Sequence, residues 1–430
     1  MNKSLTYILS VILYVVFAQA CITFSPDHSA QNTNRDIKIT KAWKRKISIP
    51  FELINNLVVV PLRINDSDTL HFVLDTGVGR MLITELPEDK ELAIKYTRNV
   101  KLSGLGDDEP VVALFSSGNT IVMDGVAGDS LDVVVMLEDV FNLSSFMGRE
   151  INGLIGYDIF KNFIVEINYT HKKLYFHDPD LYAEKYAKKK RSRRWTKIDI
   201  EIENRKPYLN TWFVQKDSTI IQANLLIDSG ASHAIALYPS SNDSIFIPAK
   251  RLYSYLGTGL SGDIYGEIGR AERMGFGEIT IENPVVYYPE EEGIHRAILE
   301  NNRNGSIGSD LLKRFKLFIN YEDSTILVKP NNKFKQDFNY NMAGIEVGTP
   351  IPNLPIYVVS RVRKGSPADI AGILVDDIIT EINFKKAHLL DLGQIYENFQ
   401  DQDGKKITMV IRRNDDETRK FVFRLKDKTR

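Results

Sequence analysis

The sequence predicts a mainly β protein, made of two related lobes and a small α+β domain after them. Three observations carry this prediction. An apolar run that ends in Asp-Thr/Ser-Gly occurs twice, at 72–77 and at 225–230, and each run is too short for a helix and stops at a glycine turn, as buried strands do. Further short motifs follow both copies at matching distances. From about residue 342 the pattern changes, and strand-like runs flank a Gly-Ser-Pro-Ala segment at 365–368.

The two copies keep their landmarks in register. Gly104 and Gly257 each lie 29 residues after the aspartate of their own copy, Asp75 and Asp228. An Ile-Gly motif ends 81 residues after the first aspartate and 80 after the second, and an Ile-Asn-Tyr motif ends at 94 and 93. Short motifs that match by coincidence seldom keep four landmarks in register. The chain therefore carries an internal duplication.

Residues 1–21 have the features of a targeting segment. Lys3 gives a charged start, 5–17 an apolar core, and Ala-Gln-Ala at 18–20 a small-residue cleavage site. The apolar core is too short for a membrane span. Cys21 follows directly and resembles the acylated cysteine of the bacterial lipoprotein lipobox, whereas plain secretion is the alternative. We therefore expect an exported protein of the cell envelope, periplasmic or anchored in the outer membrane of a Gram-negative bacterium, and held at the membrane by lipid if Cys21 is acylated.

Composition argues against several classes of partner, cofactor and catalytic group. A net charge of −1 argues against nucleic acid as a partner, and 43% hydrophobic residues are enough for real cores. With one cysteine there is no internal disulfide and no catalytic thiol in the body of the chain. The seven histidines show no metal-binding spacing, so we expect no metal and no cofactor. The glycine pattern at 257–262 fits a dinucleotide fingerprint, but its alignment with the first copy favours a hairpin.

Domain boundaries follow from changes of pattern along the chain. The basic run between the lobes is expected to be a solvated connector, with a docking patch or an exposed cleavage site as the alternatives. The expected order is a polar tether (22–45), a first lobe (46–182), a basic connector (183–195), a second lobe (196–330), a linker (331–341) and the small domain (342–430).

The duplicated aspartates suggest a chemistry. Two related strands would present Asp75 and Asp228 to each other across a pseudo-two-fold interface. Carboxylates held close together cannot both ionise, so they share a proton. The ionised member can take a proton from water while the protonated member hydrogen-bonds the carbonyl of the bond to be cleaved. The neighbouring residues would allow a tight turn and hydrogen-bond backbone across the interface (Gly77, Gly230, Thr76 and Ser229).

This paired motif resembles the signature of the aspartic proteases, over about 285 residues. The Ile-Gly-x-Asp form is more similar to retropepsin-type lobes than to pepsin lobes, here in tandem. The resemblance implies two β-barrel lobes with the active site between them, Asp75 and Asp228 as the catalytic pair, and no cofactor. It also implies active-site support from Thr76, Gly77, Ser229, Gly230 and Ser232, and flap glycines over the substrate cleft at Gly104, Gly106, Gly257 and Gly259.

One departure from the family pattern concerns the first lobe. The second lobe continues with Ala231 and Ser232, as the family does, whereas the first continues with Val78 and Gly79 and lacks the hydroxyl. Because Asp75 would then have fewer donors for its charged form, our hypothesis is that the pair titrates higher than in relatives with both hydroxyls. The alternative is that the lobe is catalytically inactive and only binds peptides. Asp158 and Asp310, in the Ile-Gly-x-Asp motifs, are interpreted as helix caps.

The small domain resembles the PDZ domains of bacterial envelope proteases, on the motifs at 365–372 and 376–383. Such domains bind peptide ends or strands at a sheet edge, so a peptide ligand is expected. The sequence as a whole predicts a secreted or lipid-anchored aspartic endopeptidase that acts on a peptide or protein substrate. The alternatives are a catalytically inactive envelope protein that binds peptides through the cleft and the PDZ domain, and a structural surface lipoprotein.

Overall fold

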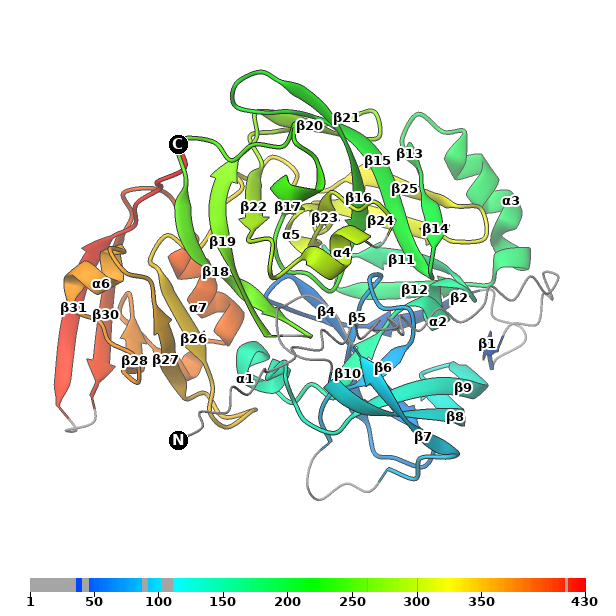
Figure 1. The fold of residues 1–430 in the computed structure, drawn as a ribbon. Coiled ribbons are helices and arrows are strands. Elements are labelled where there is room, and N and C mark those ends of the chain that lie inside the picture. The colour runs from blue at the N-terminus through cyan, green and yellow to red at the C-terminus, as the bar shows by residue number, and fades with distance from the viewer. Residues whose placement is uncertain are drawn as a thin grey trace, which may run out of the picture. The chain divides into compact units, whose positions relative to one another are not determined.

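The computed structural model describes residues 36–40, 46–86, 92–102, 111–260, 262–299, 301–413 and 417–430. The expected targeting segment and Cys21 lie outside these ranges. Within them, no helix is both long and apolar enough to cross a membrane. The chain is mainly β, as predicted, with a sheet in each of two related lobes, a sheet that joins them, and a small α+β domain after them (Figure 1).

In the first half of the chain, the described residues form the following strands and helices. In order they are β1 (Ile37–Ile39), β2 (Lys46–Pro50), β3 (Glu52–Ile54), β4 (Leu57–Ile64), β5 (Leu70–Leu74), β6 (Met81–Ile83), β7 (Thr97–Leu102), β8 (Val111–Met123), β9 (Val126–Met136), α1 (Leu143–Met147), β10 (Gly153–Ile155), α2 (Tyr157–Phe160), β11 (Ile164–Asn168), β12 (Lys173–His177) and α3 (Pro179–Lys190).

The second half repeats much of this order. It consists of β13 (Thr196–Asp199), β14 (Glu201–Glu203), β15 (Lys206–Val214), β16 (Ile220–Ile227), β17 (Ile235–Leu237), a 3₁₀ turn (Pro239–Ser241), β18 (Leu252–Gly259), β19 (Gly262–Arg270), β20 (Arg273–Phe276), β21 (Ile279–Glu282), β22 (Val285–Pro289), α4 (His295–Leu299), β23 (Gly305–Ile307), α5 (Ser309–Leu312), β24 (Phe315–Asn320) and β25 (Thr325–Pro330).

A six-stranded sheet joins the two lobes, in the order β13-β25-β24-β11-β12-β2. Its central pair is antiparallel, with Val165 of β11 opposite Ile319 of β24. Next to β11 lie β12 and then β2, all from the first lobe. Next to β24 lie β25 and then β13, all from the second lobe. The sheet therefore has a pseudo-two-fold axis at its centre, as an internal duplication requires.

Each lobe also has its own sheet, built around the strand that precedes its motif aspartate. The first sheet runs β1-β9-β6-β10-β5-β4-β8-β7, and the second runs β18-β19-β22-β17-β23-β16-β15-β20-β21. In both, the aspartate strand (β5 or β16) is antiparallel to the strand before it and parallel to the short strand of the Ile-Gly motif (β10 or β23). This parallel neighbour brings two distant motifs of each copy together.

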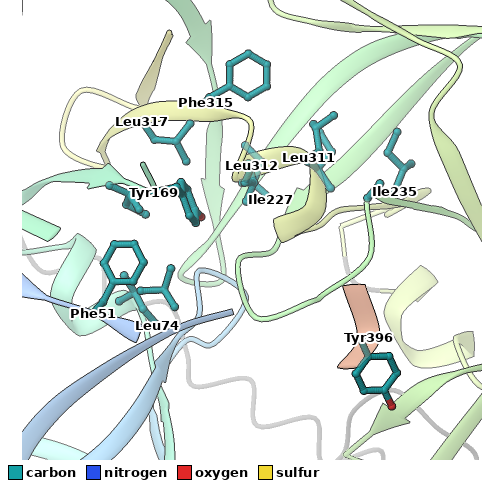
Figure 2. Packing of buried hydrophobic residues seen from close by; sticks show 14 of the residues in the cluster. Phe51, Leu74, Tyr169, Ile227, Ile235, Leu311, Leu312, Phe315, Leu317 and Tyr396 are labelled. Atoms are coloured by element: carbon teal, nitrogen blue, oxygen red, sulfur yellow. The ribbon is translucent and has the colours of Figure 1, made fainter. Parts of the chain in front are cut away.

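Apolar residues hold both aspartate loops on one core. Leu74 and Ile227, which directly precede the aspartates, are 1% and 0% exposed. Figure 2 shows them with other buried side chains of the same cluster, among them Tyr169, Leu312 and Phe315. Burial of such side chains is the main stabilising contribution to a fold, so the site rests on rigid strand ends.

Three segments expected to be connectors are structured. Strand β1 pairs with β9, so the end of the expected tether at 22–45 is part of a sheet. Helix α3 spans the expected boundary between 182 and 183, because its Tyr182 and Tyr186 bury their rings against a strand of the joining sheet. In the expected linker at 331–341, Phe338 and Tyr340 are likewise buried.

The PDZ domain has one sheet in the order β26-β27-β28-β30-β31, with β29 paired to β28. The Gly-Ser-Pro-Ala motif begins its first helix, since Ser366 Oγ accepts a hydrogen bond from the Asp369 N–H and proline occupies the first turn. Its elements are β26 (Ile345–Gly348), β27 (Tyr357–Val362), α6 (Pro367–Ala371), β28 (Ile378–Ile382), β29 (Lys385–Lys386), a 3₁₀ turn (Ala387–Leu389), α7 (Leu392–Phe399), β30 (Lys406–Arg412) and β31 (Thr418–Arg424).

Candidate active site

Two strand ends place the motif aspartates at equivalent points of the two lobes. Asp75 directly follows β5, and Asp228 directly follows β16. The Asp75 N–H donates to the carbonyl of Ile155 at 2.8 Å, and the Asp228 N–H donates to that of Ile307 at 2.8 Å. Ile155 and Ile307 end the parallel strands β10 and β23. The Ile-Gly motifs thus fix where each aspartate leaves its sheet.

Four hydrogen bonds join the two aspartate loops across the lobes. The Thr76 hydroxyl donates to Ile227 O at 2.6 Å and accepts from the Ser229 N–H at 2.9 Å. The Ser229 hydroxyl donates to Leu74 O at 2.8 Å and accepts from the Thr76 N–H at 3.0 Å. Thr76 is 0% exposed and Ser229 1%, so water does not compete for these groups. Each hydroxyl satisfies a donor and an acceptor of the other lobe, which fixes the loops relative to each other.

The motif glycines leave room for the carboxyl groups. A Cβ atom on Gly230 would lie 2.3 Å from Asp75 Cγ, and one on Gly77 would lie 3.1 Å from Asp75 Oδ1 and 3.2 Å from Asp228 Cγ. Gly77 therefore lies against both carboxyl groups, which shows that the two aspartates are neighbours. The Ile-Gly glycines are equally confined, because a Cβ on Gly156 would lie 1.9 Å from Asp75 O.

The carboxyl groups of Asp75 and Asp228 both lie against Gly77, since a Cβ atom there would be 3.1 Å from Asp75 Oδ1 and 3.2 Å from Asp228 Oδ1. Each also accepts a backbone hydrogen bond within its own loop, from the Gly77 N–H at 2.7 Å and from the Gly230 N–H at 3.1 Å. Burial and then the charge of Asp228 raise the pKa of Asp75 to about 8, against the opposing effect of the Gly77 N–H. Burial and the neighbouring charge thus favour the protonated form of Asp75 at neutral pH.

The second lobe carries a serine, Ser232, at the position where the first lobe has Gly79. In the described part of the chain, the Ser232 side chain makes no hydrogen bond to Asp228, so a hydroxyl at this position does not distinguish the two carboxyl groups. The raised pKa of Asp75 results from burial, followed by the charge of Asp228.

Sequence reasoning missed two contacts that brace the aspartate loops. The turn between β3 and β4 reaches the second lobe, where Asn56 Nδ2 donates to Ser232 O at 2.9 Å. The turn between β14 and β15 reaches the first lobe, where Arg205 Nη1 donates to Gly79 O at 3.4 Å. Both turns have two central residues with positive φ. A two-residue, Asn-containing turn between strand-like runs is a hairpin signal, so the hairpins, though not their contacts, could have been predicted.

The hairpin of β18 and β19 carries two of the expected flap glycines. Gly257 lies at a β-bulge with φ of 147°, and Gly259 is opposite Gly262 near the tip. At the tip, Leu260 packs on an apolar cluster of the first lobe (Leu82, Ala113, Val134 and Met136). A hairpin of one lobe therefore reaches the other. The remaining flap glycines, Gly104 and Gly106, and the lipidation candidate Cys21 lie outside the described residues.

The aspartates of the Ile-Gly-x-Asp motifs are not caps. The N-cap positions of α2 and α5 are glycines, Gly156 and Gly308, and neither helix has a side-chain cap. Asp158 and Asp310 lie within the first turns instead, where a carboxylate is still favourable near a helix N-terminus. Asp310 also pairs with Lys313 at 2.6 Å.

Other candidate chemistries have less support. His233 is hydrogen-bonded through Nε2 to Ser306 Oγ at 3.0 Å, and burial lowers its pKa to about 4, so the ring is neutral at pH 7. Across the described ranges, no group of His, Cys, Asp and Glu side chains could hold a metal ion. In contrast, a carboxylic acid beside a carboxylate can serve as acid and base in the same reaction.

The edge strand of the PDZ domain is partly covered by the domain itself. Strand β26 is at the edge of the sheet, and its Val347 N–H donates to the hydroxyl of Tyr396 on α7 at 3.0 Å. The same hydroxyl lies 3.0 Å from Glu346 Oε2. A peptide that extended the sheet at β26 would need this backbone N–H, so Tyr396 would have to move first.

Comparisons with known proteins support this description. Residues 60–159 match the family described as "Aspartyl protease", and residues 358–413 match the family described as "PDZ domain". No curated protein matches the chain. Among solved structures, the crystal structure of an aspartic proteinase from Irpex lacteus matches with a TM-score of 0.43 and 11% identity, over 68% of this chain and 99% of that chain. The chain thus contains an aspartyl protease domain and a C-terminal PDZ domain.

Proposed function

We propose that the protein is an aspartic endopeptidase that hydrolyses peptide bonds with Asp75 and Asp228. One observation carries the proposal: two neighbouring carboxyl groups, one from each lobe, lie in loops that four cross-lobe hydrogen bonds join. A structural role alone would not require two carboxyl groups that burial and mutual repulsion destabilise. The match of residues 60–159 to aspartyl proteases agrees with this reading.

The raised pKa of Asp75 suggests how the two groups divide the work. Asp75 is the acid and donates a hydrogen bond to the oxygen of the scissile carbonyl, while Asp228 is the base and takes a proton from water. The water oxygen then bonds to the carbonyl carbon and gives a tetrahedral intermediate. Asp228 then returns its proton to the amide nitrogen and the C–N bond breaks, which leaves one new carboxyl and one new amino end.

Substrate and location are part of the proposal. A peptide or protein segment would lie extended between the lobes, under the hairpin that carries Gly257 and Gly259, with Thr76, Gly77, Ser229 and Gly230 holding the pair in place. We further propose export to the cell envelope and a lipid anchor on Cys21, as the first 21 residues suggest. A peptide strand at β26 would be the ligand of the PDZ domain.

The second candidate function is a catalytically inactive protein that binds peptides in the cleft and at the PDZ domain. The first lobe favours it, because Val78 and Gly79 follow Asp-Thr-Gly there, where the second lobe has Ala231 and Ser232 as the family does.

The test is cleavage of a mixed peptide pool by the purified protein between pH 3 and 8, read by mass spectrometry. Asp75→Asn and Asp228→Asn should each lower the cleavage rate by about 10²–10⁴-fold, because each removes a proton donor or acceptor from the reaction. Asp158→Asn is the matched control, since Asp158 lies in the helix after β10, outside the pair, and should leave the rate within about threefold of the wild type. A folded wild type that cleaves nothing at any pH would favour the binding protein.

A further inference from the structure

We propose that Arg361 of the PDZ domain is a positioning residue for the cleft: it holds the β18–β19 hairpin closed across the two lobes, so that substrate must compete with this contact. The proposal rests on the proposed function, because it names a control of the same cleft. It concerns the second-lobe hairpin at 252–270, drawn in green in Figure 1.

The tip of the hairpin lies next to the strands that carry the first aspartate loop. Leu260 packs in the same cluster as Leu82 of β6 and Leu154 of β10. Leu154 is opposite Leu82 in the sheet and also pairs with Val73 of β5, two residues before Asp75. The hairpin therefore crosses from the second lobe onto the strands around Asp75, which is where a peptide between the lobes would have to pass.

The half of the same hairpin nearer the tip is held by the PDZ domain through one arginine. Arg361 Nη1 donates to the Tyr265 hydroxyl at 2.9 Å, and the guanidinium forms an ion pair with Asp263. The guanidinium also lies 4.5 Å from the centre of the Tyr255 ring. Three side chains, from both strands of the hairpin, thus meet a single group of another domain.

The contacted side chains are linked to the tip. The Tyr255 hydroxyl is 2.6 Å from Thr258 Oγ1, and Thr258 Oγ1 donates to Asp263 Oδ1 at 3.0 Å. Thr258 is two residues from Leu260, so the network ends close to the residue that packs on the first lobe. A second arginine adds to the contact, since Arg363 Nη1 lies 3.4 Å from Ser254 Oγ.

The chemistry of the contact requires arginine. The Arg361 side chain is 43% exposed, and an isolated ion pair at that exposure contributes little. A planar guanidinium can serve an aromatic face, a hydroxyl and a carboxylate at once, whereas an ammonium is a point charge that cannot do all three. Strand β27 holds Arg361 in register opposite Glu346, so its backbone position is set by the PDZ sheet.

A closed hairpin in equilibrium with an open one has a defined kinetic signature. If only the open form admits substrate, the apparent KM is raised by the closed population, whereas kcat is unchanged once substrate is bound. Weakening the contact should therefore lower KM and leave kcat in place. Damage to the aspartate loops would have the opposite effect, because it would lower kcat.

The experiment compares the full-length wild type with Arg361→Ala, Arg361→Lys and a matched control. The control is Lys386→Ala, which removes another ion pair of the PDZ sheet, Lys386 with Glu381 at 2.9 Å. Two readouts are taken: hydrogen–deuterium exchange of the hairpin at 252–270, and KM and kcat on a peptide that the wild type cleaves.

We expect Arg361→Ala to speed exchange in the hairpin about three- to tenfold and to lower KM by a similar factor, with kcat within about twofold. Arg361→Lys should resemble alanine, and Lys386→Ala should resemble the wild type. Exchange in the hairpin that is the same in Arg361→Ala and the wild type would overturn the proposal. So would a fall of kcat with an unchanged KM.

The exchange readout separates this proposal from the proposed function. If no variant cleaves peptide but the hairpin of Arg361→Ala exchanges faster, the contact holds the hairpin and the endopeptidase assignment is wrong. If the wild type cleaves peptide but exchange and KM do not respond to Arg361→Ala, the endopeptidase stands and the positioning role is wrong.

Discussion

The first and second lobes hold Asp75 and Asp228 with the same backbone bonds, yet the surroundings of the two aspartates differ. The backbone N–H of each aspartate donates to the last carbonyl of a parallel strand at 2.8 Å. In each loop one side-chain hydroxyl also forms hydrogen bonds to the backbone of the other lobe. The space beside the two glycines differs, because a Cβ atom on Gly230 would lie 2.3 Å from Asp75 Cγ, whereas one on Gly77 would lie 3.2 Å from Asp228 Cγ. The bracing turns also differ, because one carries Asn56 and the other Arg205.

This difference shows which parts of the duplicated motif must match. The hydroxyls of Thr76 and Ser229 satisfy buried backbone groups of the opposite lobe, so loss of either would leave unpaired polar groups in the core. Positions 79 and 232 lie outside these bonds, and one is a glycine and the other a serine. Symmetry is therefore needed at the interface between the lobes and is relaxed away from it.

The largest expected effect concerns the two motif glycines. Gly230→Ala would place Cβ 2.3 Å from Asp75 Cγ, so the carboxyl group must move, and a displacement of about 1 Å in a reacting group can lower a rate about 10²-fold. Gly77→Ala meets its nearest atom at 3.1 Å and should lower kcat/KM less than tenfold. Peptide cleavage assays measure both.

The control for this pair is Gly79→Ala, whose added Cβ would meet its nearest atom at 3.4 Å and should be tolerated. If Gly77→Ala and Gly230→Ala lower kcat/KM equally, the difference in the space available for a Cβ atom at the two glycines does not affect catalysis.

The next effect tests the symmetric part of the comparison. Thr76→Val and Ser229→Ala each leave a buried N–H and a buried carbonyl without a partner, so each should lower the free energy of unfolding by about 2–4 kcal/mol. The two values should agree within about 1 kcal/mol, and the double variant should cost less than their sum. Denaturant unfolding measures all three.

Thr84→Val is the matched control. Thr84 is also buried, at 2% exposure, but its hydroxyl has no hydrogen-bond partner in the described structure. Its replacement should be neutral or stabilising. A large loss in this control would mean that burial of a hydroxyl, rather than the cross-lobe bonds, decides the result.

A pH profile tests the origin of the raised pKa of Asp75. Because burial and the charge of Asp228 raise the pKa of Asp75 to about 8, the protonated form of Asp75, which serves as the acid, is lost as the pH rises through this value. Activity should therefore fall as the pH rises through about 8. Gly79→Ser should leave this alkaline limb within about half a pH unit, since burial and Asp228 raise the pKa. If the alkaline fall in activity moved to lower pH by a full unit in Gly79→Ser, the missing hydroxyl would be the cause of the raised pKa of Asp75.

The sequence predicted the parts of this molecule that depend on short motifs and their spacing. Two apolar-Asp-Thr/Ser-Gly runs in register predict two matching strands, and hydroxyls beside buried aspartates predict bonds across an interface. The contacts of Asn56, Arg205 and Arg361 depend on which loops meet after folding, which no local pattern encodes. Helix α3 was missed for a similar reason: its basic residues suggest a solvated connector, whereas Tyr182 and Tyr186 anchor it on a strand of the other lobe.

The smallest effect concerns the two bracing turns. Asn56 and Arg205 both have positive φ, 72° and 67°, so replacement by glycine removes the side chain without adding backbone strain. Asn56 donates to Ser232 O at 2.9 Å and accepts from Lys313 at 2.7 Å, whereas Arg205 makes a longer contact of 3.4 Å at the surface. Arginine also tolerates positive φ less well than asparagine, so glycine relieves more strain at position 205.

Asn56→Gly should therefore lower the free energy of unfolding by about 1 kcal/mol, whereas Arg205→Gly should leave it unchanged within about 0.5 kcal/mol or raise it. Denaturant unfolding of the two variants in parallel gives the difference directly. A larger loss for Arg205→Gly would mean that the arginine contributes through its contact with the Tyr157 ring, 5.3 Å away, and the first-lobe loop would then be the more strongly braced of the two.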